Sequence, residues 1–303
     1  MSATNPSAPA GAAADLAAIA ICTLCWGTTW YAITLQVGVV DPIISIVYRF
    51  GLAAALLFAW CALRREQLML SPPQHAAAFG IGLFTFAVDY AFVYWAEERI
   101  TSAVVAVVFA SMAFVNLIVF RIVFAQRPAA LAWAAAALGI IGVALLSWEE
   151  IAAAQFGAAA MAGIALTLAG VIAAAVGNVF ARRGEMAGAP VAALTGWAMF
   201  YGSALLALFA LATDKVWAFE WTPGYVLSLL HLAVNGSVIA FLLYYGLARR
   251  RGYGSASYIA ALTPPVAMIV SSLFEAKTWG MLALAGVALV LAGQWLLLRV
   301  RKA

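Results

Sequence analysis

Residues 158–181 read AAAMAGIALTLAGVIAAAVGNVFA, an uninterrupted stretch without a charged side chain. A helix of about 20 apolar residues is needed to cross the hydrocarbon core of a bilayer, so this stretch predicts a transmembrane helix. Comparable stretches recur along the whole chain. A membrane β-barrel would instead alternate apolar and polar residues in segments of about ten residues, a pattern that this sequence lacks.

The composition of the whole chain agrees with this interpretation. Of its 303 residues, 67% are hydrophobic and 9% are charged, and the mean hydropathy is +1.03. Soluble domains are about half apolar and about a quarter charged, because a globule needs polar surface to meet water. The composition therefore excludes a soluble enzyme, a nucleic-acid-binding protein and a disordered chain. It leaves an all-α integral membrane protein.

Ten segments are predicted as transmembrane helices. Lysine and arginine concentrate in cytoplasmic loops. The two sides of a ten-span arrangement hold twelve and three of the 16 Lys and Arg residues, and Arg49 lies within a span. Both termini are therefore expected in the cytoplasm, and Glu97 and Glu98 in a loop on the outer side. The predicted spans are residues 16–36, 42–63, 76–96, 101–121, 129–147, 158–181, 190–212, 224–247, 255–273 and 279–298.

The two halves of the chain resemble each other at an offset of about 150 residues. Each half holds five predicted spans, an odd number, so the second half must enter the membrane upside down. Inverted repeats are typical of secondary transporters, whose substrate site lies near the midplane between the repeats. We expect a flexible cytoplasmic tail at residues 1–15, a first five-helix repeat at 16–147 and a second, inverted five-helix repeat at 158–298.

Three groups of residues carry a family resemblance. They are CWGTTW at residues 25–30, Pro42 with Arg49, and residues 244–298, which contain Leu262-Thr263-Pro264-Pro265. In this order, and with ten spans, they resemble the drug/metabolite transporter superfamily in its ten-helix EamA-type branch, and most of all its YddG-type exporters of aromatic amino acids. The resemblance implies the ten-helix fold and export of small metabolites across the bacterial inner membrane.

Two positions depart from that family pattern. Members often have a proline within the fourth span, where this chain has Ala110-Ser111-Met112. Members also often end that span with a glutamate, where Gln126 stands here. Both departures argue against a mechanism that needs two matched hinges or two matched carboxylates.

Two charged residues, Arg49 and Asp89, are predicted inside spans, where charge is costly and marks a candidate functional site. Each is about seven residues from the outer end of its span, hence about 10 Å deep at the helical rise of about 1.5 Å per residue. The two spans run antiparallel, so the depths can match. The alternatives are a structural ion pair, a gating or proton-coupling pair that breaks during transport, and two charges that face different cavities.

A cavity for an aromatic substrate needs stacking faces and a few polar groups. Helix–helix hydrogen bonding is an equal alternative for each polar residue, and a histidine such as His231 can bond a backbone carbonyl or a substrate carboxylate. Two adjacent prolines remove backbone donors and favour a kink or a hinge. The candidate substrate-binding residues are Trp26, Trp30, Phe86, Tyr90, Tyr94, Asn178, His231, Asn235, Ser237, Ser257 and Tyr258, and the candidate gating or coupling residues are Arg49, Asp89, Pro264 and Pro265.

The sequence favours a secondary transporter over other membrane proteins. It has no glycine-rich phosphate-binding loop and no H-E-x-x-H motif, which argues against an ATP-driven pump and an intramembrane enzyme. No rings of charge suggest a channel. We expect alternating-access export of amino acids, aromatic and other neutral ones. The alternative is export of another small amphipathic metabolite or drug by proton antiport.

The expected partners are a small-molecule substrate, an amino acid, and the lipid bilayer. No cofactor, no metal and no nucleic acid is expected. A monomer is compatible with the sequence, which leaves the oligomeric state open.

Overall fold

The computed structural model describes residues 8–126, 129–153, 157–256, 258–276 and 278–299. Throughout these residues the regular structure is helical, without strands. Seven helical runs in this part of the chain are long and apolar enough to cross a membrane: Ala13–Thr34, Pro42–Arg64, Pro72–Glu97, Ser102–Phe124, Ala158–Met186, Val191–Ala212 and Pro223–Arg251. The predicted all-α membrane class is confirmed.

Three shorter apolar helices lie where the sequence predicts the fifth, ninth and tenth spans. Their apolar segments are Ala130–Gly142, Leu262–Phe274 and Met281–Gly293. These segments belong to α7 (Ala130–Ala153), α13 (Tyr258–Phe274) and α14 (Met281–Arg299). A helix thus lies at each predicted span, while the ten crossings and the cytoplasmic termini stay predictions.

Three of the long runs change their geometry part-way. The third span consists of α3 (Pro72–Ile81), a π-helical segment η1 (Gly82–Asp89) and α4 (Tyr90–Glu97). The eighth span has the same construction, with α10 (Pro223–Ala233), η2 (Val234–Ile239) and α11 (Ala240–Arg251). The fourth span is broken between α5 (Ser102–Phe109) and α6 (Met112–Phe124). The remaining helices are α1 (Ala8–Thr34), α2 (Pro42–Arg64), α8 (Ala158–Met186), α9 (Val191–Ala212) and the short α12 (Tyr253–Ala256).

The first helix begins earlier than the sequence analysis expects. The sequence predicts a flexible tail up to residue 15, but α1 begins at Ala8, and residues 1–7 lie outside the described part of the chain. Alanine is the strongest helix former, and residues 8–14 are mostly alanine. Asp15 is also held by Arg250 and Arg251 at the end of α11, with N–O distances of 3.0 and 2.5 Å. Residues 8–15 therefore belong to the helix.

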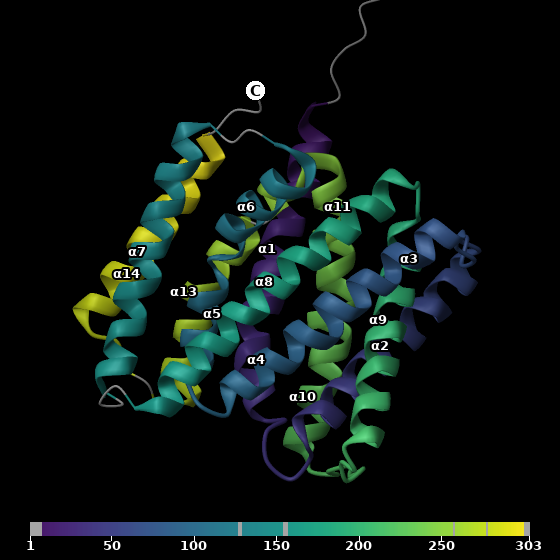
Figure 1. The fold of residues 1–303 in the computed structure, drawn as a ribbon, viewed down its shortest axis with the longest axis horizontal. Helices are drawn as coiled ribbons and strands as arrows, with labels where there is room; N and C mark the ends of the chain where they lie inside the picture. Colours follow the sequence, from purple (N-terminus) through teal and green to yellow (C-terminus); the bar gives the residue numbers. More distant parts are fainter. Residues whose placement is uncertain (1–7, 127–128, 154–156, 257, 277, 300–303) are drawn as a thin grey trace, which may run out of the picture.

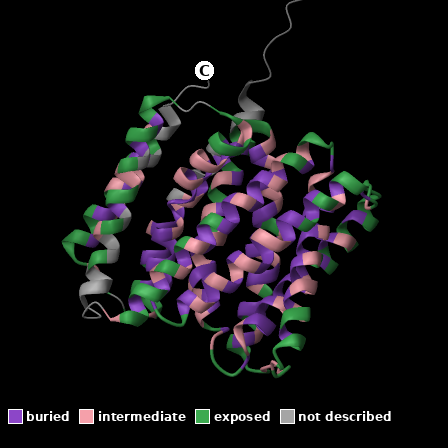
Figure 2. Ribbon diagram, in the orientation of Figure 1, coloured by how far each residue is buried: buried purple, intermediate pink, exposed green. Residues whose placement is uncertain are grey.

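The helices pack in pairs that draw one member from each half of the chain. Helix α2 packs on α9, and α7 packs on α14 at one edge of the molecule (Figure 1). Helix α1 packs on α13 and on the α10–η2–α11 run, while α8 packs on α6 and on the α3–η1–α4 run. Buried residues concentrate in these central helices, and α7 is largely exposed (Figure 2). The centre of the molecule is thus built from both halves.

The contact between α7 and α14 depends on glycines. A Cβ atom added to Gly142 would lie 2.5 Å from the carbonyl oxygen of Gly286, and one added to Gly293 would lie 2.5 Å from that of Ala135. Small residues at such positions let two membrane helices approach closely. A Cβ atom added to Gly139, one turn before Gly142, would meet nothing within 4 Å.

We therefore predict that Gly142→Ala destabilises the protein and that Gly139→Ala does not. Overpacking against a backbone carbonyl costs about 1–3 kcal/mol, whereas alanine in an open helical position is neutral or favourable. The measurement is the apparent Tm of each purified variant in detergent. Equal Tm values for Gly142→Ala and Gly139→Ala would show that the α7–α14 contact is looser than described.

Candidate functional site

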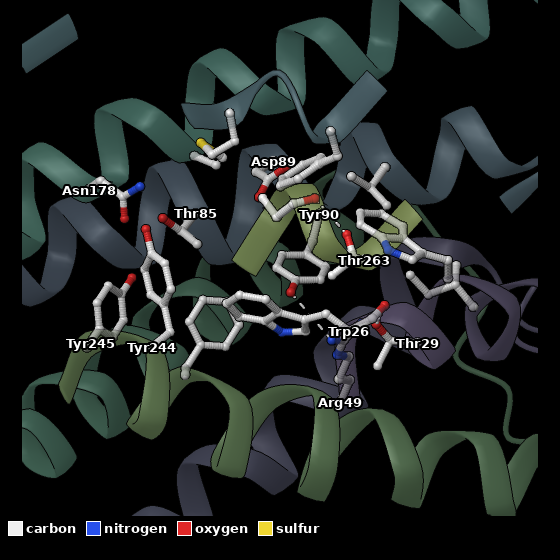
Figure 3. Close-up of a pocket in the computed structure, with 18 residues that line it drawn as sticks. Trp26, Thr29, Arg49, Thr85, Asp89, Tyr90, Asn178, Tyr244, Tyr245 and Thr263 are labelled. Carbon is white, nitrogen blue, oxygen red and sulfur yellow. Dashed lines mark hydrogen bonds between the residues drawn. The ribbon is translucent and has the colours of Figure 1, made fainter. Parts of the chain in front are cut away.

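A cavity lies among the central helices. Binding sites for small molecules are commonly lined mostly by apolar and aromatic groups. The lining residues come from both halves of the chain. They include the aromatic residues Trp26, Trp30, Tyr90, Phe109, Phe241, Tyr244 and Tyr245, the charged residues Arg49 and Asp89, and the polar residues Thr29, Thr85, Asn178 and Thr263 (Figure 3).

Arg49 is a deeply buried cation on the wall of this cavity, with 1% of its surface exposed. Its Nε donates a hydrogen bond to Ser237 Oγ at 3.0 Å, and its Nη2 lies 3.5 Å from the Tyr90 hydroxyl, to which it donates a long bond. The guanidinium also lies 4.6 Å from the centre of the Tyr90 ring and 5.1 Å from that of Phe50. Its Nη1 is buried and has no hydrogen-bond partner among the described residues. Arg49 thus keeps a donor available.

Asp89 lines the same cavity and is 3% exposed. Its Oδ1 accepts no hydrogen bond from any described residue, and it packs against Gly170 of α8. Among the ion pairs of the described residues, none joins Asp89 to Arg49 within 4.0 Å. In Figure 3 the Tyr90 ring lies between the two charged side chains. The two charges therefore share a cavity without forming an ion pair.

The π-helical segments place several of these groups. Thr85 and Asp89 belong to η1, and Tyr90 follows it directly. Ser237, which holds Arg49, belongs to η2 and donates its own hydrogen bond to the carbonyl oxygen of Leu232 at 2.8 Å. A π-helix has one extra residue per hydrogen-bonded turn, and such segments are often found at functional sites. Neither π-helical segment is predicted by the apolar pattern of the sequence.

Aromatic side chains form the walls. The Trp26 indole N–H donates to the carbonyl oxygen of Gly236 at 3.1 Å, and its ring lies 5.3 Å from Phe241 and 5.4 Å from Tyr244. Trp30 lies 5.3 Å from Phe109. Such distances are typical of edge-to-face and tilted aromatic pairs. The indole of Trp26 is therefore fixed by a hydrogen bond and by ring contacts from the second half of the chain.

Six of the predicted site residues line the cavity: Trp26, Trp30, Arg49, Asp89, Tyr90 and Asn178. Asn178 also donates to Asn116 Oδ1 at 3.2 Å, so it makes the alternative helix–helix contact as well. Pro264 and Pro265 lie within α13, next to the lining residue Thr263.

Other predicted residues lie close to the cavity without lining it. Phe86 is fully buried between Phe50 and Phe241, at ring distances of 4.8 and 4.9 Å. Tyr94 is fully buried one turn beyond Tyr90. Ser237 acts through Arg49, as described above. Ser257 lies outside the described residues, and the description of Tyr258 covers only its place at the start of α13.

His231 and Asn235 belong to a separate hydrogen-bonded chain. The His231 Nδ1 lies 2.9 Å from Asn235 Nδ2, and its Nε2 lies 3.0 Å from Thr28 Oγ1. An amide nitrogen can only donate, so Nδ1 accepts and Nε2 carries the proton. Neither residue is among those that line the cavity. The sequence predicts a backbone carbonyl or a substrate carboxylate as the partner of His231. In the structure its two ring nitrogens instead contact the side chains of Thr28 and Asn235.

Further aromatic and polar residues line the cavity without being among the predicted site residues: Thr29, Thr85, Phe109, Phe241, Tyr244, Tyr245 and Thr263. Tyr244 and Tyr245 mark the repeat in the sequence, and Thr29 lies in the CWGTTW motif, so a signal existed for these three. Phe109, Phe241 and Thr85 have no distinguishing pattern, since they occur in apolar stretches like any buried residue. No group of three or more metal-binding side chains occurs among the described residues.

Comparisons with known proteins identify the family. The model of the EamA-like transporter family matches residues 14–148 and again residues 161–299. The protein named "Uncharacterized inner membrane transporter YedA" from Escherichia coli (strain K12) is 30% identical over 251 residues, which cover 82% of this chain and 78% of that protein. The "Probable amino-acid metabolite efflux pump" from Salmonella typhimurium is 25% identical over 282 residues, 89% of this chain and 90% of that protein.

A solved structure shares the fold. The structure described as "Crystal structure of protein" has a TM-score of 0.71 and 19% sequence identity, and the alignment covers 94% of this chain and 96% of that one. At this identity the likeness concerns the fold alone.

The environment of Arg49 leads to a prediction about stability. Burial of a charge costs several kcal/mol, and an apolar replacement of similar volume is often neutral or stabilising. We expect Arg49→Met to have a Tm no lower than that of the wild type in detergent. We expect Ser237→Ala to lower the Tm, because Arg49 Nε would lose its acceptor at a cost of about 1–3 kcal/mol. A large loss of Tm in Arg49→Met would assign Arg49 a structural role instead.

Proposed function

The chain belongs to the EamA-like transporter family of multi-pass inner-membrane proteins, and from this premise we propose that it is a secondary transporter that exports amino acids. The observation that carries the proposal is the pair of buried, mutually unpaired charges, Arg49 and Asp89, in one aromatic-walled cavity. An amino acid has an anionic carboxylate, a cationic ammonium group and a side chain, and each finds a complementary group there.

The proposed binding mode follows from the free groups of the cavity. The substrate carboxylate accepts a hydrogen bond from Arg49 Nη1, which has no partner among the described residues. A charge-assisted bond of this kind is about twice as strong as a neutral one. The substrate ammonium group donates to Asp89, and an aromatic side chain packs against Trp26 and Tyr244. This mode favours aromatic and other neutral amino acids, the specificity of YddG-type exporters.

One relative supports the substrate class. The Salmonella typhimurium relative carries the name "Probable amino-acid metabolite efflux pump". The apolar part of the cavity wall would also accommodate another small amphipathic metabolite or drug, which is the alternative substrate. A nucleotide sugar is disfavoured, because several cations are needed for its phosphates and Arg49 is the one that lines the cavity among the described residues.

Alternating access between two inverted repeats is the proposed mechanism. Each span of the first half corresponds to one span of the second half in chain order. Under this correspondence the α1–α13 contact matches the α8–α6 contact, and the α2–α9 and α7–α14 pairs each join two corresponding helices. The segments η1 and η2 begin ten and eleven residues after the first prolines of their runs, Pro72 and Pro223. These correspondences support ten spans in two related halves, with 16–147 and 158–298 as the repeats. The distribution of lysine and arginine supports cytoplasmic termini. The break at Ala110–Ser111 and the prolines Pro264 and Pro265 are the proposed hinges.

Counterflow into liposomes that contain only the purified protein tests the proposal. The liposomes are preloaded with unlabelled phenylalanine, and labelled phenylalanine, tryptophan, threonine or a nucleotide sugar is supplied outside. We expect saturable exchange of the aromatic amino acids and little of the nucleotide sugar. In Arg49→Met we expect the apparent affinity to fall about 30-fold or more, since losing one partner of a buried charged bond costs about 2–5 kcal/mol.

The matched control for this experiment is Arg121→Met, which removes an exposed arginine at the end of α6. This variant should exchange phenylalanine as the wild type does. If folded wild-type protein exchanged none of the amino acids but did exchange another amphipathic solute, the amino-acid assignment would be wrong and the alternative substrate class would replace it.

A further inference from the structure

Glu97 is a buried carboxyl group outside the cavity. The sequence analysis expects it in an outer loop next to Glu98, but it is the last residue of α4 and is 9% exposed. Neither of its carboxyl oxygens has a hydrogen-bond partner among the described residues. The adjacent Glu98 is exposed and pairs with Arg99 at 3.2 Å. Of these two neighbouring glutamates, Glu97 is thus buried without a partner in the described part of the chain, whereas Glu98 is exposed and forms an ion pair.

The free energy of burial decides the protonation state of Glu97. An ionised carboxylate that has no partner and lines no cavity is so costly to bury that it takes up a proton and becomes neutral. Asp89 differs from Glu97 because it lines the cavity together with the Arg49 cation. Glu98 has solvent and Arg99, so it meets no such cost. Glu97 therefore holds a proton in this conformation.

A second carboxyl group lies at the same place. Ser102, at the start of α5, donates a hydrogen bond to Glu275 Oε2 at 2.6 Å. Glu275 directly follows α13, so this bond ties the end of α13 to the turn between α4 and α5, where Glu97 lies. The charge of Glu275 disfavours the ionised form of Glu97, and the charge of Arg49 favours it. Tyr94 lies one turn earlier on the same helix and is buried.

The contacts of this junction also involve α1. The Tyr31 ring stacks on Phe274, the last residue of α13, at 5.0 Å. Loss of the proton from Glu97 would place a buried negative charge near the Glu275 carboxyl group. Like charges at short range repel, and the repulsion is strong where the dielectric constant is low. Deprotonation of Glu97 thus favours separation of the α13 end from the α4–α5 turn, and the prolines of α13 allow that movement.

We propose that Glu97 is a proton-binding site that couples the movement of α13 to the pH on the outer side. This inference rests on the proposed transport function, which by itself leaves the coupling ion open. In the conformation described, Glu97 is neutral and the Ser102–Glu275 bond is made. When α13 moves away, water reaches Glu97 and the proton leaves. A ligand that binds one of two conformations shifts the population towards it, so a proton gradient biases the transport cycle.

The first test detects the proton directly. Infrared difference spectra of the wild type and of Glu97→Gln, both in lipid, are compared for the carbonyl stretch of a neutral carboxyl group. We expect a band in the wild type that shifts in D2O, that is lost in Glu97→Gln and that persists in the control Glu98→Gln. An unchanged band in Glu97→Gln would overturn the inference.

The second test measures coupling in liposomes. With one proton per substrate, a pH step of one unit supports at most about tenfold accumulation of labelled phenylalanine. We expect pH-driven accumulation in the wild type and in Glu98→Gln, and its loss in Glu97→Gln. Glu275→Gln keeps an acceptor for Ser102 but removes the like charge, so its pH profile should shift towards lower pH, because Glu97 then loses its proton more readily.

The outcomes separate this inference from the proposed function. Exchange of amino acids by the wild type without any response to the pH step would overturn the role of Glu97 and leave the exporter assignment intact. Absence of all exchange would contradict the exporter assignment, and the infrared bands would still decide whether Glu97 carries the proton.

Discussion

Arg49 is a cation within a membrane-spanning helix, and the geometry of the cavity depends on the groups that keep it there. Placing a charge in a region of low dielectric constant costs several kcal/mol. Its charge-assisted bond to Ser237 contributes about 1.5–3 kcal/mol and its contact with the Tyr90 ring up to about 2 kcal/mol. These terms offset part of the cost, and no carboxylate within 4.0 Å among the described residues supplies the rest. The positive charge of Arg49 can therefore bind an anionic group of a ligand.

The partners of Arg49 are positioned by irregular backbone. Ser237 lies within η2, and Tyr90 directly follows η1, so both contacts depend on the π-helical geometry of the third and eighth spans. In a bilayer, departures from α-helical hydrogen bonding are tolerated where protein covers them or where they line a cavity. Both segments satisfy this condition, because Thr85 and Asp89 line the cavity and the carbonyl oxygen of Gly236 accepts the Trp26 indole N–H. The same departures thus create the cavity and hold its charge.

The sequence predicts the helices far better than it predicts their irregularities. Length and hydropathy locate a helix at each expected span, since the bilayer imposes one strong requirement on every crossing segment. Arg49 and Asp89 are found because charge within an apolar stretch is rare. Whether they pair depends on side-chain directions, and the π-helical turn at Asp89 changes those directions without any residue that marks it. The sequence wrongly predicts that Glu97 lies in an outer loop, for a similar reason. A glutamate at a helix end looks identical in sequence whether it faces water or the protein.

The fourth span shows that a helix break needs no proline. At Ala110–Ser111 the backbone tightens, and the Ser111 N–H bonds the carbonyl oxygen of Val108, three residues earlier, at 3.1 Å. The residues on either side of the break, Phe109 and Met112, line the cavity, as Thr263 does beside Pro264 in α13. A proline would enforce such a break by removing a donor, whereas here the N–H groups of Ala110, Ser111 and Phe114 all bond carbonyl oxygens. The two spans therefore differ: α13 continues as a helix through Pro264 and Pro265, which lack a backbone donor, whereas the fourth span is interrupted at Ala110–Ser111, where the donors are present.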